Sequence, residues 1–230
     1  MHIRDIAKNL TPRTTKSSFA DDTRVQRGTH SSNDCSILQS DLKRIYSWVS
    51  TVNMGEKFEC LRFWPSSSKV PEFDYLGPNG EVIEVKDNLK DLGVNVGSDL
   101  TFKLHIEKVV ASANKMAGWG LMTFKRRSIA TMKTIWNSLV QPQLDYCSQF
   151  WSPCDQESNN SLEAVQRHFL SKVQDKEVTS LNYWDMLKAL RIYSQERHRE
   201  RYMAIFLWKV SQGMVKWVPH GSYWCCWAPG

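Results

Sequence analysis

The hydrophobic pattern changes at Thr101, and this change limits the possible folds more than any other feature of the sequence. Before it, short apolar runs alternate with turn signals, which is typical of strands. After it, apolar residues recur at helical spacing almost to the end of the chain. A part rich in strands followed by a part rich in helices predicts the α+β class.

Two hairpins are predicted before Thr101. Residues 17–27 form the first, with Asp21 and Asp22 at its turn, because aspartate tolerates tight turn geometry. The second has the stronger signal, since the Asn-Gly of Gly77-Pro78-Asn79-Gly80 readily supplies positive φ between strands over 73–76 and 81–85. The remaining expected elements of this part are a helix over about 34–50, begun by Ser31-Ser32-Asn33-Asp34, and strands over 57–63 and 92–96.

Apolar stripes predict the helices after Thr101. They cover residues 104–117, a segment from Ser128 that Pro142 should kink or end, 162–170, 184–190 and 202–210. Trp151-Ser152-Pro153 should end a segment between them. Five tryptophans lie within or beside these stripes, and core packing is the expected use of most of them: Trp119, Trp136, Trp151, Trp184 and Trp208. Residues 219–230 have no periodicity and are expected to be an unstructured tail.

Composition limits the kinds of binding partner and site that the sequence predicts. The chain has 230 residues and a net charge of +6, which favours a polyanionic partner such as nucleic acid. Its ten tryptophans suit either core packing or base stacking. Its six cysteines include no C-x-x-C pair, so we expect reduced thiols rather than a zinc site. With no apolar leader and no run of about 18 apolar residues, we expect an intracellular protein of the nucleus or cytoplasm without a membrane span.

Ordered sequence segments then point to a family. In the first part they are Phe19-Ala20-Asp21-Asp22-Thr23, Leu38-Gln39-Ser40-Asp41-Leu42 leading to Trp48, Asn53-Met54, Lys57-Phe58-Glu59, Lys90-Asp91-Leu92-Gly93-Val94, Phe102 and His105-Ile106. In the second part they are Thr123-Phe124-Lys125-Arg126-Arg127, residues 138–147, Trp151-Ser152-Pro153 and Leu162-Glu163-Ala164-Val165-Gln166-Arg167. Their order and spacing resemble the second half of the reverse transcriptase of LINE-type (jockey-like, non-LTR) retrotransposons, over about residues 3–218.

The resemblance implies part of a right-hand polymerase, an RNA-directed DNA polymerase. Residues 1–64 would be a palm remnant with the Phe-Ala-Asp-Asp hairpin, and 65–100 a hairpin and strand that grip the primer end. Residues 101–218 would be the helical thumb and its extension. The partners implied are an RNA template, a DNA primer and, in the intact family, a dNTP. Lys125, Arg126 and Arg127 would contact the template–primer phosphates.

The resemblance also implies nucleotidyl transfer with two Mg²⁺ ions about 4 Å apart. Asp21 would be a direct ligand of Mg²⁺ and Asp22 a supporting one, since Mg²⁺ prefers one or two carboxylates together with phosphates and waters. Phe19 and Ala20 would lie at the substrate, with Phe19 beneath the primer terminus. Lys57 occupies the place where many polymerases set a general acid, and a solvated lysine at the start of a strand is an equal alternative.

The same resemblance predicts a chain that is inactive alone. The family needs fingers and another catalytic Asp from an upstream strand, both expected before Met1, and the usual Phe-Asn ahead of Lys57 is missing here. Three interpretations stay open. The chain is a C-terminal reverse transcriptase fragment, a non-catalytic thumb remnant that binds nucleic acid, or a degenerate element product without function. The basic clusters at Lys125–Arg127 and Arg197–Arg201 are both expected on helices, and only the second is partly neutralised, by Glu196 and Glu200.

Overall fold

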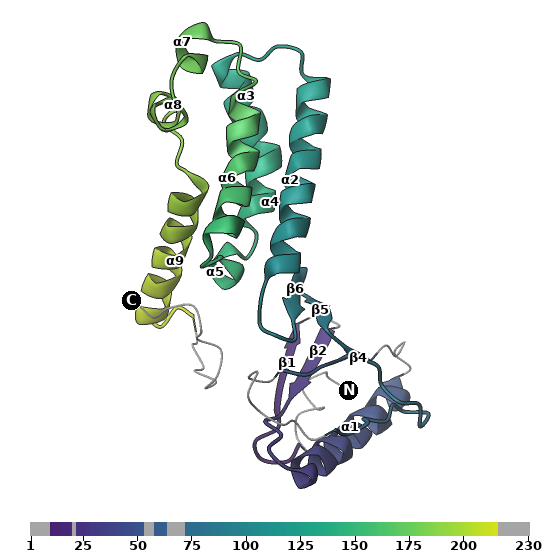
Figure 1. Cartoon of the computed structure of the whole chain (residues 1–230). Helices are drawn as coiled ribbons and strands as arrows, with labels where there is room; N and C mark the ends of the chain where they lie inside the picture. The colour runs from purple at the N-terminus through teal and green to yellow at the C-terminus, as the bar shows by residue number, and fades with distance from the viewer. Residues whose placement is uncertain (1–9, 20–21, 53–57, 64–71, 216–230) are drawn as a thin grey trace. The chain divides into compact units, whose positions relative to one another are not determined.

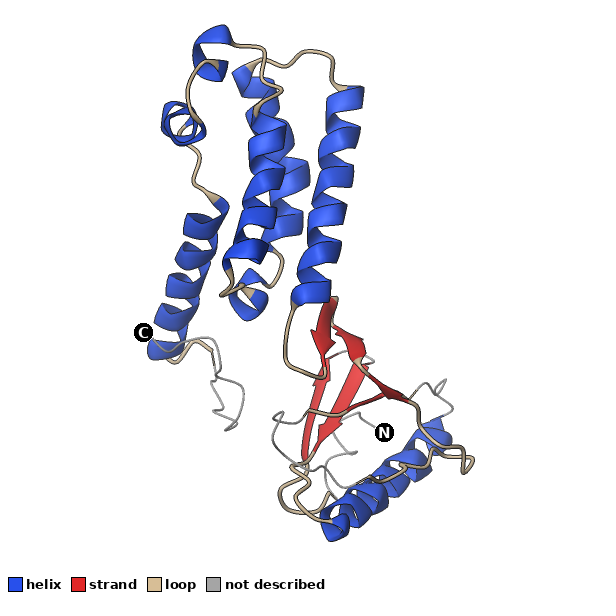
Figure 2. Cartoon of the chain, viewed as in Figure 1, coloured by secondary structure: helices blue, strands red, loops and turns tan. Residues whose placement is uncertain are grey.

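A computed structural model of the chain describes residues 10–19, 22–52, 58–63 and 72–215 (Figure 1). The chain divides into two compact units. The first comprises Met1–Asp91 and Val96–Leu100, and the second comprises Leu92–Asn95 and Thr101–Gly230. Helices dominate the second unit, whereas strands occur before Leu100 (Figure 2). The mixture of helices and small antiparallel hairpins agrees with the α+β class.

The first predicted hairpin and helix are confirmed. Strands β1 (Thr15–Phe19) and β2 (Asp22–Gln26) pair antiparallel, and Phe19 lies opposite Asp22. Helix α1 (Ser32–Val52) follows. Its start has reciprocal capping, because the Asp34 N–H donates to Ser31 Oγ (3.3 Å) while Asp34 Oδ2 accepts from the Ser31 N–H (3.1 Å).

The core of the first unit lies between α1 and the segments that follow it. Its buried members are Cys35, Tyr46, Tyr75 and Ile83, with Leu38, Leu42, Phe58, Cys60 and Phe73 packed against them. Gln39 of α1 fixes the second hairpin through two hydrogen bonds. Its Nε2 donates to the Leu76 carbonyl (3.0 Å), and its Oε1 accepts from the Leu76 N–H (2.8 Å). A buried amide thus joins α1 to a backbone segment 37 residues away.

The second predicted hairpin is present in a shorter form than expected. Leu76 and Val82 form a single antiparallel bridge, and Gly80 has the positive φ (84°) expected of its turn. The strand predicted over 57–63 is reduced to β3 (Cys60–Leu61), which pairs parallel with β4 (Val85–Lys86). Lys57 lies outside the described residues.

A third hairpin replaces the strand predicted over 92–96. Strands β5 (Asn88–Asp91) and β6 (Val94–Gly97) form a two-stranded sheet, and Leu92 and Gly93 are the turn between them. Both turn residues have positive φ, 45° and 87°, as a two-residue hairpin loop of the primed type requires. The prediction that Leu92 and Gly93 lie in a strand was therefore wrong.

Tyr146 holds this turn. Its hydroxyl donates to the Leu92 carbonyl (2.7 Å), and a Cβ added to Gly93 would lie 3.3 Å from Tyr146 Cε1. Next to the turn, the Asn95 N–H donates to Nδ1 of His105 (3.3 Å), and Lys108 Nζ donates to Asn95 Oδ1 (2.9 Å). The residues Leu92–Asn95 are thereby bound to the helical unit.

The helices of the second unit follow the predicted stripes. They are α2 (Lys103–Thr123), α3 (Ile129–Ile135), the π-helical turn η2 (Trp136–Val140), α4 (Gln141–Asp145), α5 (Ser148–Trp151), α6 (Gln156–Leu170), α7 (Lys176–Thr179), α8 (Tyr183–Leu190) and α9 (Gln195–Ser211). Ser128 caps α3, since its side chain accepts from the Thr131 N–H. Trp151 ends α5 as expected, whereas the four-residue α7 was not predicted.

Pro142 does not end its helix. The Gln141 N–H donates to the Trp136 carbonyl, five residues back, so the helix widens into the turn η2 just before the proline. Such a π-bulge adds a residue to the turn and accommodates a break in the regular hydrogen-bond ladder. Helix α4 then begins with Pro142 in its first turn, where a missing N–H costs little.

The core of the second unit contains two of the five tryptophans that were expected to pack inside. Trp136 and Trp151 are fully buried, together with Met132, Leu144, Leu162, Phe169 and Leu170. Trp119, Trp184 and Trp208 are half-exposed, so core packing was a wrong prediction for them. None of the described helices combines the length and the apolar character needed to cross a membrane.

A buried network of polar side chains joins α4, α6 and α9. Gln195 Nε2 donates to the side-chain oxygens of Gln141 (3.0 Å) and Gln166 (2.5 Å). Trp136 Nε1 also donates to Gln141 Oε1 (2.8 Å). The Glu163 carboxylate accepts from the Gln195 N–H (2.8 Å) and from the Tyr183 hydroxyl. Because these buried groups satisfy one another, the network fixes how the three helices pack.

Candidate functional site

The β1–β2 hairpin positions the residues predicted to be catalytic. Phe19 of β1 pairs with Asp22 of β2, and Ala20 and Asp21 lie outside the described residues. Phe19 is 68% exposed, and Asp22 is exposed beside it. Both side chains are therefore accessible to a large ligand.

One charged side chain of the β1–β2 hairpin forms an ion pair within the first unit. Asp22 and Arg24 are two residues apart on β2, so they share one face of the hairpin. The Arg24 guanidinium pairs with the carboxylate of Asp91, at the end of β5. Arg24 therefore pairs with Asp91 and not with Asp22. Among the described residues, no cation forms an ion pair with Asp22.

The described residues do not fit a two-metal centre. They supply one of the two predicted carboxylates, Asp22, and no group of three His, Cys, Asp or Glu side chains in this part of the chain could hold an ion. Mg²⁺ sites of this type need carboxylates that converge with phosphates and waters. We therefore derive no catalytic step through Mg²⁺ from these residues.

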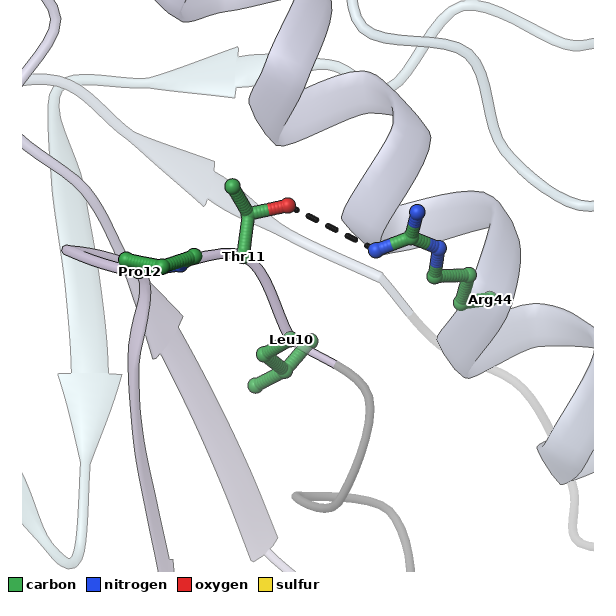
Figure 3. A pocket seen from close by; sticks show the side chains of 4 residues that line it. All are labelled: Leu10, Thr11, Pro12 and Arg44. Atoms are coloured by element: carbon green, nitrogen blue, oxygen red, sulfur yellow. Dashed lines mark hydrogen bonds between the residues drawn. The ribbon is translucent and has the colours of Figure 1, made fainter.

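A hollow of about 560 Å³ lies beside the start of the described chain, lined by Leu10, Thr11, Pro12 and Arg44 (Figure 3). Arg44 Nη1 points at the Thr11 hydroxyl (3.5 Å) and also at Asp41 Oδ1 (3.1 Å). Among the described residues that line the hollow, Arg44 is the cation and pairs with a structural carboxylate, and none of them is a predicted site residue.

Asp41 explains why the segment before β1 stays attached to α1. It is fully buried and accepts hydrogen bonds from the Thr11 N–H (3.1 Å), the Thr11 hydroxyl (2.8 Å) and the Thr14 hydroxyl (2.6 Å). Burial alone would raise the pKa of Asp41, but these hydrogen bonds and the charge of Arg44 bring it below the ordinary value of 3.8.

The Asp41→Asn variant should show, through the pH dependence of stability, that the Asp41 carboxylate stabilises the fold. The pKa of Asp41 is lower in the folded chain than in the unfolded chain, so the unfolded chain takes up the proton first as pH falls. The Asp41 carboxylate therefore adds to the free energy of unfolding above about pH 4, and this addition is lost as pH falls further. The asparagine NH2 group would stand where a carboxylate oxygen accepts from a threonine hydroxyl, so two donors would meet. We therefore expect the free energy of unfolding to fall by about 1–3 kcal/mol at pH 7. Urea unfolding at pH 7 and pH 3 measures the effect.

The exposed Asp74→Asn is the matched control and should change little at either pH. The loss caused by Asp41→Asn should shrink at pH 3. An equal loss at both pH values would contradict a stabilising carboxylate at position 41.

The cations predicted to bind phosphate lie on a loop, not on a helix as expected. Helix α2 ends at Thr123 and α3 begins at Ile129, and between them Lys125 and Arg126 are exposed while Arg127 is half-buried. The carbonyl of Arg127 accepts from the Gln174 N–H (2.8 Å). This bond ties the α2–α3 loop to the connection between α6 and α7, at the same end of the helical unit (Figure 1).

Two further cations therefore join the predicted cluster. Lys172 is half-buried in the connection that Gln174 ties to the loop, and Lys176 is exposed as the first residue of α7. Of the acids there, Asp175 is engaged as the cap of α7, where its side chain accepts from the N–H groups of Glu177 and Val178. We call Lys125, Arg126, Arg127, Lys172 and Lys176 the basic end of the helical unit. Sequence reasoning missed the last two, because only the long-range bond brings them to the loop.

The second basic cluster is partly engaged within the fold. Arg199 is buried and donates to Asn159 Oδ1, and Arg197 pairs with Glu200 (3.8 Å). His105, read from the sequence as structural, is buried with its ring edge-on to Trp151 at 5.2 Å. Burial and the nearby Lys108 lower the pKa of His105, which keeps the imidazole neutral. These residues stabilise the fold.

The chain matches no protein-family model, no curated protein and no solved structure. The resemblance to a polymerase family therefore rests on the ordered segments of the sequence alone.

Proposed function

We propose that this chain is the C-terminal part of the reverse transcriptase of a LINE-type retrotransposon, and that its own contribution is to hold nucleic acid. The observation that carries the proposal is the basic end of the helical unit. Two segments 47 residues apart, at Arg127 and Gln174, meet through a backbone bond and gather five cations there. Clustered lysine and arginine side chains bind the phosphates of nucleic acid and release counterions.

The hairpin supports the same proposal. The Phe-Ala-Asp-Asp segment spans the end of β1, the connection and the start of β2, where a polymerase would present its carboxylates on a short rigid turn. In the intact family these carboxylates would bind two Mg²⁺ ions for nucleotidyl transfer, with a dNTP as substrate. The described residues supply one of these carboxylates, Asp22, and no group of three ligands. We therefore propose that the chain binds RNA template and DNA primer without extending the primer.

Binding to an RNA–DNA duplex tests the proposal. The purified chain should shift the fluorescence anisotropy of a labelled hybrid at low salt, and the affinity should fall steeply as salt rises. The double variant Lys125→Gln/Arg126→Gln should weaken binding about tenfold and reduce the slope of log K against log salt by up to about 2, since two phosphate contacts are lost.

The matched control removes two exposed cations of α9, Arg197→Gln/Arg201→Gln, and should leave both affinity and slope nearly unchanged. An equal effect of the two double variants would show that net charge, and not the basic end, governs binding. No binding even at low salt would favour a degenerate product without function. Primer extension by the chain with Mg²⁺ and dNTPs, abolished by Asp21→Ala, would overturn the inactive state proposed here.

A further inference from the structure

One face of α2 is not covered by the rest of the helical unit. Residues three or four apart along it are all exposed, namely Leu104, Lys108, Ala111, Lys115, Trp119 and Met122. The opposite face supplies the buried residues His105, Ile106, Ala113, Ala117 and Gly120. The division follows the helical repeat, so the exposed side chains form one continuous stripe.

The C-terminal half of this stripe combines an aromatic ring with cations. Trp119 is 51% exposed, Met122 lies one turn further along, and Lys115 lies one turn before. Lys125 and Arg126 follow directly after the helix. Large apolar side chains exposed next to one another mark binding surfaces more often than chance, and an exposed indole beside cations is a feature of surfaces that stack bases.

The charge along this part of the chain has one sign. Residues 108–144 contain six lysines and arginines and no aspartate or glutamate. Three of the six are engaged by the protein itself: Lys108 with Asn95, Arg127 with the Leu121 carbonyl, and Lys133 with the Leu190 carbonyl. Within the described residues, Lys115, Lys125 and Arg126 have no hydrogen-bond or ion-pair partner. Those three cations are the ones nearest in sequence to Trp119.

We propose that the outer surface formed by Lys115, Trp119, Met122, Lys125 and Arg126 binds single-stranded nucleic acid. A base stacks on the Trp119 indole, and the three cations bind the flanking phosphates. Paired bases hide their faces inside a duplex, so the exposed Trp119 indole can stack only on an unpaired base. The inference rests on the proposed function for nucleic acid as the partner, and adds that this surface takes an unpaired strand.

The experiment compares two labelled strands of about 15 nucleotides with the full chain, by fluorescence anisotropy at low salt. One is oligo(dT), and the other is an abasic strand with the same phosphates and no bases. The wild-type chain should bind oligo(dT) about tenfold more tightly than the abasic strand, in line with stacking of one or two bases. Trp119→Ala should remove this preference and leave the affinity for the abasic strand unchanged.

The control is Trp184→Ala, which removes a tryptophan of equal exposure (55%) from α8 in the same unit. It should keep the preference for bases, whereas Lys115→Gln should weaken both strands equally. The inference would be overturned if the Trp119→Ala variant kept the full preference for oligo(dT) over the abasic strand. If the RNA–DNA hybrid still binds through Lys125 and Arg126, the proposed function survives that result. Failure to bind any of the strands or the hybrid would instead contradict the proposed function itself.

Discussion

Replacing Phe169 with alanine should lower the free energy of unfolding by about 3–5 kcal/mol, the typical cost of emptying the volume of a buried aromatic ring. Phe169 lies on α6, is completely buried, and its ring centroid is 5.3 Å from that of Trp136. Trp136 cannot move in to fill the space, because it is fixed by its hydrogen bond to Gln141 (2.8 Å). The loss should appear as a lower urea midpoint when unfolding is followed by tryptophan fluorescence.

Phe150→Ala is the matched control for this change. Phe150 is 61% exposed and touches Phe102 edge-on at 5.2 Å, so its removal should cost about 1 kcal/mol or less. Equal losses for the two variants would mean that α6 is not the centre of the core. A loss confined to Phe169→Ala would confirm the position of the core.

Glu163→Gln should cost about 3 kcal/mol, because it removes a negative charge near a buried positive one. Arg199 is buried, and burial lowers its pKa while the carboxylate of Glu163 acts in the opposite direction. Glutamine at position 163 would keep an oxygen for the Tyr183 hydroxyl or the Gln195 N–H but would leave the guanidinium without that carboxylate. Urea unfolding at pH 7 gives the loss.

The double variant Glu163→Gln/Arg199→Met separates charge from packing. Glu163 acts on Arg199 through its charge and not through a direct ion pair. Replacing two buried opposite charges by neutral groups of similar size is often no less stable than keeping both charges. We therefore expect the double variant to regain at least half of the loss caused by Glu163→Gln. A double variant less stable than Glu163→Gln would show that Arg199 stabilises the fold through its contact with Asn159 and not through charge.

Local signals predicted the elements whose causes lie within a few residues. The Ser31 and Asp34 pair begins α1, Ser128 begins α3, and the Gly80 turn forms with the expected positive φ. In each, a side chain or a glycine acts on backbone groups no more than three residues away. The hairpin at Phe19 and Asp22 was predicted for the same reason, although its role in polymerisation stays a prediction.

The wrong predictions involve effects from outside the local pattern. Leu92 looked like a strand residue because it is apolar, yet it adopts a positive φ in a turn that Tyr146 holds from 54 residues away. Trp119 follows an apolar stripe, but nothing in the sequence shows that its face of α2 is left uncovered by the other helices of the unit.

The candidate binding surface was predicted in part. The resemblance identified Lys125, Arg126 and Arg127 as phosphate contacts, but the helix expected to carry them is a loop. Lys172 and Lys176 join them only through the bond between Arg127 and Gln174. Pairings across 47 residues leave no mark in local composition, and the same is true of Asp41, whose partners Thr11 and Thr14 lie 27 to 30 residues away.

The Leu92–Gly93 turn, which is bonded to Tyr146, determines where the chain can be divided into fragments that keep their contacts. A helical fragment beginning at Thr101, where the sequence pattern changes, would lose Leu92–Asn95 and with them the partners of Tyr146, His105 and Lys108. It would also expose the apolar surface that Val94 covers. A fragment that keeps the whole β5–β6 hairpin, starting at Asp87, retains all of these contacts and the bond from the Ser98 N–H to the Asp87 carbonyl (2.7 Å). The change of pattern in the sequence is therefore the wrong place to separate the two halves.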